Sequence, residues 1–151
     1  MSARAHSTPH TTHIPVAIIG GGQAGLSVSW YLGRAGIEHT VIESRTAVHA
    51  WQSKRWDNFT LVTPNWHCRL PGYAYDGPDP DGFMTRDEVV EWLAGWRETF
   101  TAPLREHTTV TRLRTIGDTG FELTLTTEES VELLTCDQVV VATGGYPLPV
   151  V

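Results

Sequence analysis

A short apolar run, IPVAIIG, leads directly into the glycine-rich stretch GGQAG, and this junction constrains the fold more than any other part of the chain. The run is rich in β-branched residues and lies between Pro15 and Gly20, which predicts a buried parallel strand. Residues 23–35 then carry apolar side chains at helical spacing, and Gly36 follows as a helix stop. The sequence therefore predicts a strand, a tight turn and a helix in immediate succession.

The turn carries the spacing G-x-G-x-x-G at Gly20, Gly22 and Gly25. In this pattern the first glycine allows the tight turn, the second lets a pyrophosphate approach the backbone, and the third lets helix and strand pack closely. The backbone N–H groups of Gln23, Ala24 and Gly25, at the positive end of the helix, would then hold the phosphates. The motif predicts a dinucleotide site, although glycine clusters also serve ordinary turns.

An acidic residue strengthens the interpretation, because the next predicted strand, EHTVIE, ends at Glu43, 23 positions after Gly20. A carboxylate at this place can accept hydrogen bonds from an adenosine ribose and would repel a 2′-phosphate, which disfavours NADP at this site. The alternative is a plain strand–helix turn with a solvated glutamate. The motif alone does not separate FAD from NAD.

The remainder of the chain alternates between irregular and regular segments. Residues 44–84 are rich in Trp, Pro, Asp and Gly without clean periodicity, and a long irregular segment of this kind is usually functional. Thr85 and Glu88 have capping-box spacing before an apolar helical stripe that extends to Phe100. After Pro103, alternating stretches predict one strand that enters the sheet and a small meander, and DQVVVATGG predicts a further buried strand.

The composition and net charge of the chain restrict which partners it can have and where in the cell we expect it. The chain has 11 Lys and Arg against 17 Asp and Glu, a net charge of −6, which argues against nucleic acid or an anionic membrane as a partner. Residues 1–13 are polar and predict a disordered leader without the apolar core of a signal peptide. Cys68 and Cys136 are far apart in sequence, which favours reduced thiols in the cytoplasm. No metal site is expected.

Five segments, taken in order, carry a family resemblance: GGGQAGLS, VIE, AWQSKRWDNFTLVTPNWHCRLPG, GFMTRDEVVEWL and DQVVVATGGYPLP. Together they resemble group B flavin-dependent monooxygenases and, within these, the bacterial flavoproteins labelled MSMEG-type or potassium-transport oxidoreductases. The resemblance covers residues 14–151. It implies an α/β fold, namely a Rossmann-like FAD-binding domain with a parallel sheet, a helical insertion and a β-meander.

The resemblance also implies site residues. The glycine motif and Glu43, with Ser44 beside it, would bind the ADP half of FAD, and the Ala-Thr-Gly of the last strand would pass close to its phosphates. The Trp of a Gly-x-x-Trp element would lie near the flavin, although its glycines have no match in VHAWQSKRW. The residues that match the remaining family positions are Trp51 for that tryptophan, Val110 for a backbone contact to adenine, Ala142, Thr143 and Gly144 for Ala-Thr-Gly, and Asn65 as a catalytic candidate near the reactive flavin carbon.

Family members are considerably longer and continue into a second Rossmann-like domain for NADPH. This chain has one glycine fingerprint and no visible NAD(P)H site, so we expect a truncated, FAD-binding portion that is inactive alone and acts in an NAD(P)H-dependent monooxygenase on an unidentified small molecule. One alternative is a non-catalytic nucleotide-binding fragment or a subunit that needs a complementing chain. A second alternative, a small NAD-dependent dehydrogenase, lacks a Tyr-x-x-x-Lys pair. An exposed sheet edge would favour self-association.

Overall fold

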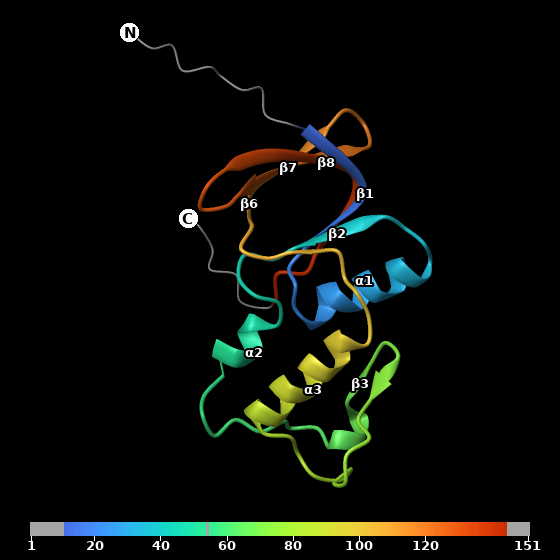
Figure 1. Ribbon diagram of the computed structural model, residues 1–151, viewed down its shortest axis with the longest axis vertical. Helices are drawn as coiled ribbons and strands as arrows, with labels where there is room; N and C mark the ends of the chain where they lie inside the picture. The colour runs from blue at the N-terminus through green and yellow to red at the C-terminus, as the bar shows by residue number, and fades with distance from the viewer. Residues whose placement is uncertain (1–10, 54, 145–151) are drawn as a thin grey trace.

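The computed structural model describes residues 11–53 and 55–144, which form one large sheet, three α-helices and a small hairpin (Figure 1). Within these residues no helix is both long and apolar enough to cross a membrane. In chain order the elements are β1 (Thr11–Ile19), α1 (Gln23–Arg34), β2 (His39–Ile42), α2 (His49–Ser53), the 3-10 turn η1 (Asn65–His67), β3 (Arg69–Leu70), β4 (Tyr73–Ala74), α3 (Arg86–Glu98), β5 (Leu104–Arg105), β6 (Thr109–Ile116), β7 (Gly120–Thr126) and β8 (Val131–Val141).

The large sheet has the strand order β5-β2-β1-β8-β7-β6. Its first four strands run parallel, with Ile19 of β1 opposite Ile42 of β2 on one side and opposite Val141 of β8 on the other. The last two strands, β7 and β6, add to β8 in antiparallel order. This is the parallel sheet with a meander that the sequence predicts.

Both faces of the parallel part of the sheet are covered. Successive side chains of β1 point to opposite faces, so they show what covers each face. Ala17 belongs to a buried cluster with Leu123 and Leu125 of β7, so the meander covers one face of the parallel strands. Ile18 belongs to a second cluster against which Val28 of α1 packs, so the helix covers the other face. Strand β1 therefore lies between two apolar layers, which explains its uninterrupted apolar sequence.

The insertion after β2 forms a third apolar cluster, which includes Val89, Leu93 and Trp96 of α3 and Leu26 of α1. Helix α3 begins at the predicted capping box: the Thr85 hydroxyl accepts from the Glu88 N–H, and the Glu88 side chain accepts from the Thr85 N–H. The cluster fixes the insertion against the amino-terminal half of α1, where the glycine motif lies.

Two boundaries differ from the sequence prediction. Strand β8 is continuous from Val131 to Val141, whereas the sequence predicted a meander strand and a separate buried strand. Its residues 131–136 pair with β7 and its residues from Leu133 to Val141 follow β1, so a single strand serves both layers. Strand β1 begins at Thr11, because its first residues pair with the start of β8, so the predicted leader ends too late. Residues 1–10 lie outside the described part of the chain.

Candidate functional site

The glycine turn between β1 and α1 is enclosed by backbone on two sides. Gly20 has φ +112°, a conformation that L side chains rarely adopt, and its N–H donates to the Ile42 carbonyl at 2.8 Å. A Cβ at Gly20 would overlap the Ala142 carbonyl oxygen, and a Cβ at Gly25 would overlap the Gly20 carbonyl oxygen. The first and third glycines of the motif are therefore needed for the turn itself, as the sequence predicts.

The second glycine faces open space. A Cβ at Gly22 would meet no atom of the described residues within 4 Å, and among these residues Gly22 caps α1 without any side-chain hydrogen bond. The first turn of α1 contains no acidic residue, and Gln23 and Ala24 are exposed. Because the first N–H groups of a helix have no acceptor within the helix, the donors here remain directed at this open space. Helix α3 differs, since its capping box and acidic first turn satisfy its own amino terminus.

The Glu43 carboxylate crosses to the glycine turn from the end of β2. Its Oε2 accepts from the Gly21 N–H at 2.7 Å, and its Oε1 accepts from the Arg45 N–H at 2.9 Å and from the Ser44 hydroxyl at 3.2 Å. A carboxylate offers about four acceptor positions, so Oε2 keeps one for a ligand hydroxyl. The structure thus brings the predicted residues Glu43 and Ser44 to the glycine motif.

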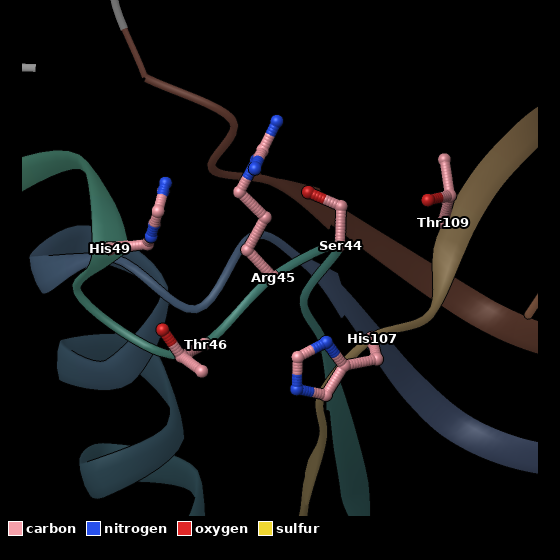
Figure 2. A pocket seen from close by; sticks show the side chains of 6 residues that line it. All are labelled: Ser44, Arg45, Thr46, His49, His107 and Thr109. Carbon is pink, nitrogen blue, oxygen red and sulfur yellow. The ribbon is translucent and has the colours of Figure 1, made fainter. Parts of the chain in front are cut away.

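A cavity of about 460 Å³ lies beside Glu43, at the carboxyl ends of β2 and β5. Figure 2 shows Arg45, on the loop after β2, and His49, the first residue of α2, extending in the same direction, with Thr109 across the opening. The described residues that line it are Ser44, Arg45, Thr46, His49, His107 and Thr109, and together they offer a guanidinium, two imidazoles and three hydroxyls but no carboxylate. The predicted contact Val110 follows Thr109 but does not itself line the cavity, because its side chain packs on the core.

Sequence reasoning missed Arg45, His49 and His107. A signal was available, because ligands of open α/β sheets bind outside the carboxyl ends of the strands, and the loop after Glu43 occupies that place. For His107 the signal was weaker, since β5 has only two residues and its position beside β2 is not evident from the sequence.

A second cavity, of about 230 Å³, lies between α1 and the insertion. Gln23, the first residue of α1, lines it together with the predicted Trp51, and the other lining residues are Leu61, Thr63, His67, Cys68, Arg69, Leu70, Met84, Val89, Trp92 and Leu93. The Arg55 guanidinium lies 4.7 Å from the Trp51 ring centroid and holds that ring by a cation–π contact. Burial raises the pKa of the Cys68 thiol, so this thiol stays protonated at neutral pH.

The loop between the two cavities contains a strained residue. Val48 is buried with φ +57°, a region that a β-branched residue rarely adopts, and its N–H donates to the Gly21 carbonyl at 3.0 Å. Val48 stands at the first position of the element in which the resemblance expects Gly-x-x-Trp. The left-handed turn that a glycine would favour is thus kept with a valine, and Trp51 retains its place on the second cavity.

The residues after β8 pass across the glycine turn. The Ala142 N–H donates to the Ile19 carbonyl at 2.8 Å, which continues the pairing of β8 with β1, and the Ala142 carbonyl lies against Gly20. Thr143 and Gly144 follow as exposed residues, with Gly144 at φ +88°. The predicted Ala-Thr-Gly segment therefore begins at the turn, where Ala142 and the Thr143 N lie against Gly20.

Asn65 does not line either cavity among the described residues, and its side chain has another role. Its Oδ1 accepts from the Met84 N–H at 2.7 Å, and its Nδ2 donates to the Asp79 carbonyl at 2.9 Å. The residue is 4% exposed, so both bonds are protected from water. Asn65 therefore holds the 79–84 loop, and its role as a catalytic candidate stays a prediction.

We expect Asn65→Ala to lower the free energy of unfolding by about 2 kcal/mol, because it leaves a buried N–H and a buried carbonyl without partners. Thermal and urea unfolding of the purified chain measure this. Asn58→Ala, at an exposed position seven residues away, is the matched control and should change stability by less than about 0.5 kcal/mol. Equal stability of the two variants would contradict the structural role of Asn65.

Comparison with known proteins adds independent information. The sequence model of the family "pyridine nucleotide-disulphide oxidoreductase" matches residues 17–151. A CzcO-like oxidoreductase of Geobacillus kaustophilus is 32% identical over 136 residues, covering 90% of this chain and 37% of the relative. The indole-3-pyruvate monooxygenase YUCCA6 of Arabidopsis thaliana is 28% identical, covering 89% of this chain and 32% of the relative.

Among solved structures, a flavin-containing monooxygenase from Stenotrophomonas maltophilia superimposes with a TM-score of 0.71 at 27% identity. The match covers 88% of this chain and 39% of the monooxygenase. The chain therefore spans less than two fifths of the length of each of these three proteins.

Proposed function

Because the chain belongs to the pyridine nucleotide-disulphide oxidoreductase family, we propose that it binds FAD and is the FAD-binding portion of a flavin-dependent oxidoreductase. The observation that carries this proposal is the open space beside Gly22, which faces the uncapped amino terminus of α1 and the carboxylate of Glu43. A pyrophosphate would approach the backbone there, where a Cβ at Gly22 would meet no described atom within 4 Å. An adenosine ribose would find an acceptor in Glu43 next to it.

The residues that would hold each part of the cofactor follow from this arrangement. The N–H groups of Gln23 and Ala24 donate to the pyrophosphate, with the positive end of α1 adding electrostatic attraction. The cavity lined by Arg45 and His107 takes the adenine, and the Glu43 Oε2 accepts from a ribose hydroxyl. The Ala-Thr-Gly segment, residues 142–144, lies against the glycine turn at the phosphates.

FAD is favoured over NAD by two observations. The second cavity begins at Gln23 and is walled by Trp51, Trp92 and other large side chains, an environment suited to a flat aromatic ring system. In addition, the structure at 27% identity is that of a flavin-containing monooxygenase. Bound FAD would supply the redox chemistry, and the residues of this chain would bind it, orient it and exclude water from it.

The complete enzyme, in this proposal, is an NAD(P)H-dependent monooxygenase that acts on a small molecule in the cytoplasm. The names of relatives such as indole-3-pyruvate monooxygenase support the reaction class. The chain spans only part of those relatives, so the nicotinamide site and the substrate pocket belong to residues outside its match. A complementing chain that brings such residues is the alternative arrangement, and in either case this chain contributes the FAD site.

Titration of the purified chain with FAD and, separately, with NAD tests the proposal. FAD should raise the melting temperature of the chain, since a ligand that binds only the folded state stabilises it. The fluorescence of FAD should be quenched when it binds. Glu43→Gln should weaken FAD binding about tenfold or more, because a charge-assisted hydrogen bond of about 2 kcal/mol to the ribose is lost. Glu38→Gln, at an exposed position before β2, is the control and should bind as the unchanged chain does. Stabilisation by NAD alone, or by neither nucleotide, would contradict the proposal.

A further inference from the structure

The side chain of Glu106, between β5 and β6, connects three segments of the chain. Its Oε1 accepts from the Ala47 N–H at 2.7 Å, on the loop after β2, and lies 3.9 Å from the Nη2 of Arg97 on α3. The Thr108 hydroxyl donates to the Glu106 carbonyl at 3.0 Å, which fixes the backbone that carries this side chain. The Glu106 carboxylate therefore joins the loop after β2 to the end of β5 and to the insertion.

The hydrogen bond to Ala47 lies directly before the strained Val48. Ala47 is 1% exposed, so its N–H depends on an acceptor within the protein. Val48 keeps φ +57°, and its N–H donates to the Gly21 carbonyl at 3.0 Å. A strained conformation persists only where the surrounding structure fixes it. Here Glu106 holds the residue before Val48, and the Trp51 N–H, which donates to the Val48 carbonyl at 3.0 Å, holds the other side.

Gly21 is the residue of the glycine turn that receives these contacts. Its N–H donates to the Glu43 Oε2 at 2.7 Å and its carbonyl accepts from Val48, so both of its polar backbone groups are engaged. The next residue, Gly22, borders the open space proposed for the pyrophosphate. The same loop also supplies residues 44–46 to the lining of the first cavity. Displacement of the loop would therefore change the glycine turn and the first cavity together.

We propose that Glu106 is a positioning residue of the FAD site. By accepting from Ala47 it keeps Val48 in its strained conformation and, through Val48, keeps the glycine turn in the shape that receives the pyrophosphate. This role rests on the proposed function. Among the described residues Glu106 lines neither cavity, so it acts through the loop and not on the cofactor itself. The hydrogen bond carries the role, since the Arg97 and Glu106 side chains are 38% and 32% exposed and an ion pair at 3.9 Å near the surface contributes little.

Fluorescence titration with FAD compares four variants of the full chain. Glu106→Ala should weaken FAD binding about tenfold, because the loop and the glycine turn lose the acceptor that fixes them. Glu106→Gln should bind within about threefold of the unchanged chain, since its amide oxygen still accepts from the Ala47 N–H. Arg97→Gln removes only the ion pair and should also stay within about threefold. Glu91→Ala, which removes an exposed carboxylate from α3, is the matched control and should bind normally.

Amide hydrogen exchange without cofactor tests the positioning separately from FAD binding. The Val48 N–H should exchange about tenfold faster in Glu106→Ala than in the unchanged chain, and Glu106→Gln should restore its protection. The Val41 N–H, which donates to the Pro103 carbonyl beside β5, is the internal reference and should not respond, which excludes general loosening of the sheet.

Three results would overturn the proposal: unchanged Val48 exchange in Glu106→Ala, Glu106→Gln as weak as Glu106→Ala, or normal FAD affinity of Glu106→Ala despite faster Val48 exchange. Circular dichroism and melting temperature confirm that the variants fold. A chain that binds no FAD in any form would refute the proposed function, and the Val48 exchange rates would still decide whether Glu106 fixes the glycine turn.

Discussion

Gly25→Ala is expected to lower the free energy of unfolding by about 3 kcal/mol, roughly 10 °C in melting temperature, and with it to abolish FAD binding at ambient temperature or above. The added methyl group would overlap the Gly20 carbonyl oxygen, which is backbone and cannot rotate away, and would press on Ile18 beneath it. Relief requires α1 to move off the sheet, and Gly22 and Gln23 move with it. Calorimetry and urea unfolding measure the loss.

Gly33 provides the control on the same helix. A Cβ at Gly33 would meet no atom within 4 Å in the part of the chain that the structure describes, and the residue is exposed near the end of α1. Alanine is the better helix former, so Gly33→Ala should raise stability by up to about 1 kcal/mol. Opposite signs at the two positions would show that the close approach of helix to strand is decisive. If both substitutions lowered stability by a similar amount, the loss would come from changing a glycine anywhere in α1, and the prediction would be wrong.

Gly22→Ala is expected to separate binding from folding. Gly22 has φ −80° and ψ −175°, which alanine adopts without strain, and no atom of residues 11–53 or 55–144 occupies the space of the new methyl group. Stability should therefore change by less than about 1 kcal/mol. FAD affinity should fall by about two orders of magnitude, since the methyl group takes the place of the approaching pyrophosphate and separates it from the helix N–H groups.

Fluorescence titration with FAD measures the affinity, and urea unfolding of the same preparation shows that the fold persists. Gly33→Ala again serves as the control and should bind FAD normally, because Gly33 lies at the far end of α1 from the glycine turn. Unchanged FAD affinity of Gly22→Ala would mean that the phosphates do not pass this glycine, and the proposed site would be wrong even if the chain bound FAD elsewhere.

The parts of the fold that the sequence predicts are those set by neighbouring residues. Gly20 and Gly25 predict their turn because the turn has no room for a side chain at these two positions. Thr85 and Glu88 predict a helix start because both residues of the capping box lie within one helical turn. Helix α1 ends at Arg34, before Gly36 at φ +68°, for the same local reason. Local chemistry dominates at each of these places.

The parts that the sequence does not predict depend on distant partners. Arg45 and His107 line one cavity although 62 positions separate them, and only the pairing of β2 with β5 brings them together. Asn65 is directed to Asp79 and Met84 by the path of a loop whose residues show no periodicity. The sequence predicts two strands where the structure has β8, because Asp137 interrupts the apolar pattern. The backbone pairing of β8 with β1 nevertheless continues on both sides of that residue.

The contact of Gly20 with Ala142 has a consequence for the order of events during synthesis. The two residues are 122 positions apart, so the motif leaves the ribosome long before the Ala142 carbonyl that lies against Gly20 has been synthesised. Contacts of such high sequence separation form late and slow the folding of the domains that need them. A nascent chain should consequently gain affinity for the cofactor only once β8 has emerged. Cofactor binding would then report that the strands from β1 to β8 have assembled.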